Sequence, residues 1–408
     1  MGFVSAFGFS ELLPIPMLLS FGMGLKLIFK IVRSGKIKII SNKILFPLAA
    51  FLSVVLLSFI LQVQNIGFRQ TGLNHLISYF ATILMYFAVP TLYMKHFKIN
   101  IDDIFKYISF GTLAVSIFII IEFITKNFSS IAFDNFIHRP SVNDYIATYS
   151  LGGVRYYRAR GVAQEPGHVA MYISMFAPFV YYYFKHILID KKKLWLSMSL
   201  VTISLVLTFS AMAFIEIALV MIVLLTYVIL KKMRKGFKVK DVFVLWAFPI
   251  VAAPTLVYFL NSPNFETIRM KLSLSTLSGE SRIGRWINAL DLFKDRPLLG
   301  NGPGITSIIY NTGSTSFYLE VLAQAGLIGL LSILTAFLSV LLSILGFKGK
   351  LKYMYLFSFL ITVIHLTVIS NYWYPWMWVL FAVVTYNSGL IERKKKVLRP
   401  SITNTLKA

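Results

Sequence analysis

The chain has 408 residues, of which 57% are hydrophobic, and it carries a formal net charge of +24 with a mean hydropathy of +0.74. This apolar content lies outside the range of soluble domains, so the composition excludes a soluble protein and predicts an all-α, polytopic membrane protein. The sequence has no cysteine, which excludes disulfides, iron–sulfur clusters and thiol chemistry.

Most of the positive charge lies in short clusters between apolar segments, at residues 26–43, 95–106, 185–193, 231–240, 348–352 and 393–407. Cytoplasmic loops of membrane proteins are rich in Lys and Arg, so these clusters predict the cytoplasmic side and contacts with anionic membrane lipids. No soluble domain lies between the clusters, and they therefore do not predict a nucleic-acid partner.

The first part of the chain predicts four membrane-spanning helices, at residues 11–32, 44–64, 75–95 and 104–125. Its N-terminus lacks a positively charged segment and a small-residue cleavage site, so we expect no signal peptide. Residues 126–166 are too polar to lie in the membrane, and the alternation of basic clusters predicts a large periplasmic loop there.

A fifth span is predicted at residues 167–188. Residues 194–230 have basic clusters at both ends, so they must cross the membrane an even number of times. We therefore expect two short helices with a turn near Phe209 and Ser210. An eighth span at residues 242–260 then leads back to the outer side.

The second large loop, residues 261–316, is also predicted to face the periplasm. A ninth span follows at residues 317–345, and residues 353–391 cross twice, with the aromatic residues 371–376 as their outer turn. Residues 1–408 are expected to form one membrane domain of about eleven helices, with the N-terminus outside and the C-terminus inside. A twelfth crossing before the first span would place both ends inside.

The second loop is predicted to contain a short amphipathic helix at residues 281–294. Its apolar residues recur at helical spacing, and they are Ile283, Trp286, Ile287, Leu290 and Phe293. Arg282 and Arg285 fall on another face, three residues apart. Ser278 is expected to cap the helix, and Glu280 to lie in its first turn.

The first loop carries a cluster of arginines, Arg155, Arg158 and Arg160, interleaved with tyrosines. Because basic clusters are disfavoured on the outer face, we predict a binding site for an anionic group, with a solvated basic loop as the alternative. Arginine presents a planar fork that binds phosphate oxygens in pairs and keeps its charge. Arg282 and Arg285 add guanidinium groups from the second loop, so we expect both loops to converge over one cavity.

Three carboxylates are candidates for activating a hydroxyl group, namely Glu165, Glu280 and Glu320. Glu165 adjoins the arginines and could equally be their ion-pair partner, and Glu280 could serve only the first turn of its helix. Glu320 lies one turn inside the ninth span, where an unpaired carboxylate is costly, so a partner or a function is expected.

Other buried ionisable residues are expected to be structural. Glu122 and Glu216 lie near the outer ends of their spans and are expected to snorkel or pair, and His365 is expected to be a satisfied core histidine. The spacing of His and Asp residues indicates no metal site, so neither a metal ion nor another cofactor is expected.

Two segments combine a fixed spacing with a position at the mouth of the predicted membrane domain. In the first, Arg160 and Gly161 precede Glu165, Pro166 and Gly167, just before the fifth span. The second comprises Arg285, Trp286, Ala289, Leu290, Phe293, Asp295, 297–300, 302–304, 318–320 and 326–329. Both segments resemble the O-antigen ligase/polymerase superfamily of bacterial envelope proteins.

The resemblance is strongest to Wzy-type O-antigen polymerases. It implies a glycosyltransferase that polymerises undecaprenyl-diphosphate-linked repeat units at the periplasmic face of the bacterial inner membrane, with a chain-length regulator and a flippase as partners. We expect Arg160 and Arg285 to act on the diphosphate, and Glu165 or Glu320 on the acceptor hydroxyl. The expected substrate-binding residues are Arg155, Arg158, Arg282, Glu280, His168 and Tyr318.

Two alternatives remain open, an O-antigen ligase that moves glycan onto lipid A-core and a transporter or flippase of lipid-linked sugars. The ligase branch carries a histidine shortly before the segment at 318–320, where this chain has Thr315 and Ser316, which favours the polymerase. A transporter would show paired halves, broken helices and midplane charges, whereas the polar residues here gather in two outer loops.

Overall fold

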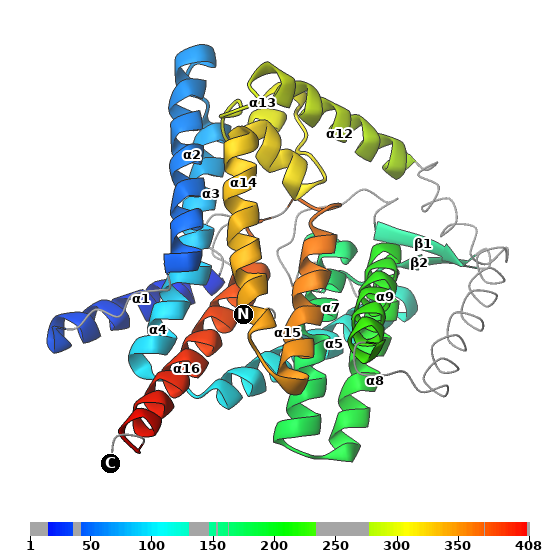
Figure 1. Ribbon diagram of the computed structural model, residues 1–408. Coiled ribbons are helices and arrows are strands. Elements are labelled where there is room, and N and C mark those ends of the chain that lie inside the picture. The colour runs from blue at the N-terminus through cyan, green and yellow to red at the C-terminus, as the bar shows by residue number, and fades with distance from the viewer. Residues whose placement is uncertain are drawn as a thin grey trace.

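The computed structural model describes residues 15–35, 42–129, 147–151, 154–161, 163–233, 277–370 and 372–405. These residues are almost entirely helical, which confirms the predicted fold class (Figure 1). The predicted span at 242–260 lies outside the described residues, as does the first part of the second loop.

The N-terminal helices follow the predicted spans closely, and they are α1 (Ile15–Ser34), α2 (Asn42–Ile66), α3 (Gln70–Thr82), η1 (Ile83–Ala88), α4 (Val89–Phe97) and α5 (Ile101–Phe128). α3, η1 and α4 follow one another without a break, and η1 is a π-helical stretch. Pro90 lies two residues after η1, at the second position of α4, where the missing N–H group removes a donor from the helical ladder.

The middle of the chain contains α7 (Pro166–Tyr182), which continues into η3 (Tyr183–Ile187), and then α8 (Lys191–Leu207) and α9 (Ala211–Met233). Residues 208–210 form the turn between α8 and α9, as the charge pattern predicts. α7 contacts α5, α8, α9 and α15, and most of its residues are buried, so it lies at the centre of the described helices.

The first loop contains a short antiparallel β-hairpin, which the sequence analysis did not predict. Its strands are β1 (Thr148–Leu151) and β2 (Val154–Tyr157), with Ser150 paired to Arg155. β2 contacts α5, and the ring of Tyr149 on β1 stacks on that of Phe209 in the turn between α8 and α9, with 4.7 Å between their centroids. Only short helices were expected in the loops, so this expectation is wrong for the described part of the first loop.

The C-terminal part contains α12 (Leu277–Asp295), α13 (Ile305–Tyr310), α14 (Phe317–Leu345), α15 (Gly349–His365) and α16 (Pro375–Thr405). α12 already includes Leu277, so Ser278 lies inside the helix and not at its cap, and that prediction is wrong. The ninth span is not one straight helix either, because α14 is broken at Gly326, whose φ of 63° and ψ of −165° are not helical.

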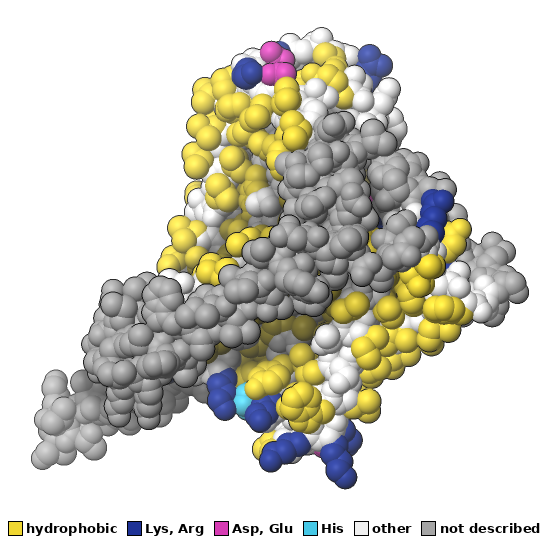
Figure 2. Space-filling model, turned by 90° about the vertical axis from the view of Figure 1, so that its right-hand side faces the viewer, with side chains coloured by type: hydrophobic (Ala, Val, Ile, Leu, Met, Phe, Trp, Pro, Cys, Tyr) yellow, Lys and Arg dark blue, Asp and Glu magenta, His cyan; other side chains and the backbone are white. Residues whose placement is uncertain are grey.

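Within the described part of the chain, five helices are long and apolar enough to span a membrane, at residues 15–34, 43–66, 70–97, 101–128 and 317–345. Their outward side chains are apolar, as Leu338 and Leu342 illustrate with exposed fractions of 53% and 60%. On the face shown in Figure 2, hydrophobic side chains cover much of the described surface between charged side chains at its two ends. The predicted count of about eleven spans stays a prediction.

Candidate functional site

The outer end of α5 holds the arginine-rich segment that follows the hairpin. The side chain of Asn127 bonds the backbone of Tyr157 twice, accepting from its N at 2.7 Å and donating to its O at 3.0 Å. Oε2 of Glu122 accepts the backbone N–H groups of Arg160, at 3.1 Å, and of Gly161, at 2.6 Å. Glu122 is fully buried, so a buried carboxylate fixes the backbone at Arg160.

Gly161 allows this segment to lie directly on the helices. Its φ is +53°, and an added Cβ would lie 3.0 Å from Ile119 and 3.2 Å from Val169. The carboxylate of Glu122 also pairs with Lys126, with 3.4 Å between Oε1 and Nζ, so the expectation that Glu122 pairs is confirmed. What sequence reasoning missed is that Glu122 binds backbone groups of a segment far along the chain.

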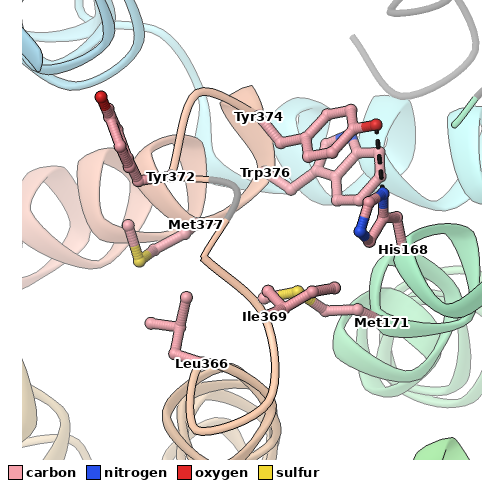
Figure 3. Close-up of a pocket in the computed structure, with 8 residues that line it drawn as sticks. All are labelled: His168, Met171, Leu366, Ile369, Tyr372, Tyr374, Trp376 and Met377. Carbon is pink, nitrogen blue, oxygen red and sulfur yellow. Dashed lines mark hydrogen bonds between the residues drawn. The ribbon is translucent and has the colours of Figure 1, made fainter. Parts of the chain in front are cut away.

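The side chain of Arg160 is buried, with 6% of its surface exposed, and it lies in a short hydrogen-bond chain. Its Nη1 donates to the carbonyl of Gln164 at 3.1 Å, and the N–H of Gln164 donates to the hydroxyl of Tyr374 at 3.0 Å. Burial raises the pKa of Tyr374, so its hydroxyl stays protonated, and this hydroxyl is hydrogen-bonded to Nδ1 of His168 at 3.3 Å (Figure 3). Arg160 is thereby linked to α7 and to the turn before α16.

Arg158 of the first loop interacts electrostatically with Arg282 of the second loop. Its Nε donates to the carbonyl of Thr208 at 3.0 Å. Burial lowers the pKa of Arg158 to about 10, the charge of Glu165 opposes this effect, and repulsion from Arg282 adds to it. Arg158 therefore stays charged at neutral pH, and Glu165 and Arg282 lie within its electrostatic range. This interaction supports the predicted convergence of the two loops, and their sharing one binding cavity stays a prediction.

Three more residues were predicted to belong to this site, namely Arg155, Arg285 and Glu280. Arg155 is exposed on β2 and donates from Nε to Oγ1 of Thr148 at 3.1 Å. Arg285 lies three residues after Arg282, on the same face of α12. Glu280 belongs to α12, but its side chain lies outside the described part of the chain.

A small pocket opens between the outer end of α7 and the turn that joins α15 to α16. Figure 3 shows its lining, which is His168, Met171, Leu366, Ile369, Tyr372, Tyr374, Trp376 and Met377. The rings of Tyr374 and Trp376 are stacked, with 4.4 Å between their centroids. His168 and Tyr374 are the residues that link this pocket to Arg160, so an apolar pocket lies directly beside the arginine-rich segment.

Glu320 anchors the second loop to α14. It is 2% exposed, and its two oxygens accept from Oγ1 of Thr306 at 2.6 Å, from the N–H of Ser314 at 2.6 Å and from the side chain of Gln324. The hydroxyl of Tyr79 donates to Gln324 at 3.0 Å and extends the network to α3. The expectation that Glu320 has a partner is confirmed, and its contacts describe a structural anchor.

The break in α14 is filled by the glycine-rich turn at residues 297–302. The N–H groups of Leu327 and Ile328 donate to the carbonyls of Pro297 and Leu298, and those of Asn301 and Gly302 donate to the carbonyls of Ala323 and Gln324. An added Cβ on Gly300 would lie 2.4 Å from the carbonyl carbon of Gln324. The glycines of the family-like motif therefore allow backbone to pack on backbone, and the turn satisfies groups that the break exposes.

Two further motif side chains have structural contacts. The hydroxyl of Tyr318 donates to the carbonyl of Val363 on α15 at 2.9 Å. Nε1 of Trp286 donates to Oγ1 of Thr315 at 3.0 Å, which holds α12 against the segment before α14. The roles of Tyr318 and Arg285 in substrate binding and catalysis stay predictions.

A buried acid–base pair joins α9 to α15. Oε1 of Glu216 lies 2.5 Å from Nδ1 of His365, and both side chains are buried, with 0% and 1% of their surface exposed. Within the described residues, neither Oε2 of Glu216 nor Nε2 of His365 has a hydrogen-bond partner. The prediction that Glu216 pairs is confirmed, whereas His365 is satisfied at only one of its two nitrogens.

No group of three or more His, Asp and Glu side chains that could hold a metal ion occurs among the residues described. Metal independence stays a prediction.

Comparison with known proteins gives one partial family match. A search of curated protein sequences found no match. Residues 196–334 match the family model described as O-Antigen ligase. This range includes α12, α13 and the break in α14, but it begins after the arginine-rich segment at Arg158 and Arg160. Over residues 196–334 the chain is therefore similar to the O-antigen ligase/polymerase superfamily.

Proposed function

We propose that this protein is a membrane glycosyltransferase that polymerises oligosaccharide repeat units carried on undecaprenyl diphosphate. The similarity of residues 196–334 to the O-Antigen ligase family supports glycosyl transfer of this general kind. We place the reaction at the periplasmic face of the bacterial inner membrane, because both arginine-bearing loops lie at the ends opposite the basic clusters.

The observation that carries the proposal is the convergence of guanidinium groups from two loops. Arg158 and Arg282 lie within electrostatic range of each other, and Arg160 is buried beside the same pocket. Guanidinium groups from both loops at one place supply positive charge and paired N–H donors. A diphosphate carries the complementary charge and matches the bidentate geometry of arginine.

In the proposed reaction, a hydroxyl oxygen of the acceptor sugar attacks the anomeric carbon of the donor. A new glycosidic bond forms, the bond from that carbon to the phosphate oxygen breaks, and the lipid diphosphate leaves. Arg158, Arg160, Arg282 and Arg285 stabilise the negative charge that develops on the leaving group. We assign Glu165 as the counter-ion of Arg158, which keeps the empty site from carrying a large excess of positive charge. This scheme uses no metal ion.

A contact in the second loop favours the polymerase over the ligase. Thr315, at the place where the ligase branch carries its histidine, accepts a hydrogen bond from Trp286 and so serves packing. Our mechanism therefore assigns no catalytic histidine at this position. We keep the ligase as the alternative, because the matching family model carries the ligase description.

The break in α14 bears on the transporter alternative, since broken helices mark transport sites. In transporters the exposed backbone lines a cavity and contacts the substrate. The backbone groups at Gly326 are instead occupied by the turn at residues 297–302, which leaves none of those four groups free for a substrate. We therefore assign the break a structural role, and we propose a flippase and a chain-length regulator as separate partner proteins.

The surface polysaccharide of a strain that lacks this protein tests the proposal. Loss of a polymerase leaves lipopolysaccharide cores capped with one repeat unit, or a capsule without polymer. Uncapped core with accumulated lipid-linked polymer would indicate the ligase instead. Accumulation of lipid-linked repeat units on the cytoplasmic side would indicate the flippase.

A further inference from the structure

The pair formed by Glu216 and His365 is the strongest buried feature that the proposed mechanism does not use. Glu216 lies in the second turn of α9, and His365 is the last residue of α15. Both positions are near the outer ends of their helices, next to the turns at residues 208–210 and 366–374. The pair is thus buried at the same end of the molecule as the arginine-rich segment.

A purely structural pair would be expected to satisfy all of its polar atoms. Here, within the described residues, two atoms have no partner, Oε2 of Glu216 and Nε2 of His365. Leaving a buried polar group without a hydrogen bond is unfavourable, so orphaned atoms in a native site call for a function or a ligand. Both of these atoms belong to one contacting pair.

The geometry of the pair fits proton transfer. When Nδ1–H of His365 donates to the carboxylate of Glu216 at 2.5 Å, the ring is fixed and the lone pair lies on Nε2. The carboxylate also stabilises the imidazolium that forms when Nε2 takes a proton. A carboxylate that orients a histidine is a common arrangement in general base catalysis.

The position of His365 relates the pair to the pocket. Leu366, the next residue, lines the pocket together with His168 and Tyr374 (Figure 3). His168 lies within electrostatic range of both His365 and Arg282. His168 on α7 is therefore the ionisable neighbour that relates the pair electrostatically to Arg282 on α12.

We propose that Glu216 and His365 form the proton-accepting pair of the transferase. This inference rests on the proposed function. Nε2 of His365 takes the proton of the acceptor hydroxyl as its oxygen forms the new bond to the anomeric carbon, and the bond to the diphosphate breaks. The leaving diphosphate keeps the electron pair of that bond, and the imidazolium later releases the proton to solvent. His365 is then a catalytic residue and Glu216 a positioning residue.

The test compares single-turnover rates and donor binding for full-length protein in lipid nanodiscs, with lipid-linked repeat units as substrate. His365→Gln keeps an N–H donor for Glu216 but removes the basic nitrogen. We expect the rate to fall by about 10²–10⁴-fold while donor affinity and the melting temperature stay unchanged. Imidazole added to His365→Ala should restore part of the rate, because it supplies the missing base.

Thr362→Val is the matched control, since Thr362 is buried on α15 one turn before His365 and donates to the carbonyl of Ser358 at 2.8 Å. Its rate should equal that of the wild type. A wild-type rate in His365→Gln would overturn the inference, as would a loss that follows lowered stability and is not restored by imidazole. If the wild-type protein itself transfers no lipid-linked glycan, the proposed function fails and not this inference alone.

Discussion

Gly326→Ala should detach the turn at residues 297–302 from α14. Gly326 has φ 63° and ψ −165°, a conformation that glycine almost alone adopts, and holding Ala there costs about 1–3 kcal/mol. The added Cβ would lie 2.4 Å from the carbonyl atoms of Leu298 and 2.7 Å from N of Gly300. These are backbone atoms, so no side-chain rotation relieves the overlap and the turn must move.

The free energy that the turn loses follows from the hydrogen bonds that its movement breaks. Four backbone hydrogen bonds cross from the turn to α14, and each contributes about 0.5–1.5 kcal/mol net. Strain and the loss of only part of these bonds together give about 3 kcal/mol, which raises the open population of the turn by roughly 100-fold.

Hydrogen exchange in nanodiscs measures this opening directly. The N–H groups of Leu327 and Ile328 should exchange roughly 100-fold faster in Gly326→Ala than in the wild type. Gly284→Ala is the control, because an added Cβ there meets nothing within 4 Å and alanine favours the helix. Wild-type exchange at both groups, together with wild-type activity, would refute the reasoning about the break.

Three further predictions concern the site. Arg285→Lys should lower the transfer rate by about 10²-fold or more, because lysine lacks the bidentate fork. Arg155→Lys, on the exposed hairpin, should leave the rate unchanged. Equal effects of the two substitutions in a transfer assay would contradict the assignment. Glu122→Gln should weaken donor binding, because an amide holds the backbone of Arg160 less well than a carboxylate. Isothermal titration with a lipid diphosphate measures this affinity, and an unchanged value would contradict the prediction. Polymerisation should continue in excess chelator, and activity that is lost and then restored by magnesium would refute metal independence.

Features set by local sequence were predictable. Apolar runs and basic clusters located the helices, and the even number of crossings required between two basic clusters located the turn near Phe209 and Ser210. Arg158 and Arg282 were recognised as candidates because arginine clusters are rare on the outer face of a membrane protein. Each of these arguments depends on residues that are close together in the chain.

Features that depend on long-range contact were not predictable. Glu122 looked like one more acid near a helix end, yet it binds the backbone of Arg160, 38 residues away. Glu216 and His365 lie 149 residues apart in the chain, and no spacing in the sequence predicts their contact. The break at Gly326 was hidden for the same reason, since an apolar sequence continues through it while its backbone is satisfied by a distant turn.

The central claim is that arginines from both loops act on one leaving diphosphate. The most direct measurement is a double-mutant cycle on the single-turnover transfer rate, with Arg160→Lys, Arg282→Lys and the double variant. Each single change should lower the rate by about 10²-fold or more, and the double variant should lose less than the product, with a coupling of about 0.5–3 kcal/mol. Losses that multiply, or single variants with wild-type rates, would contradict the claim.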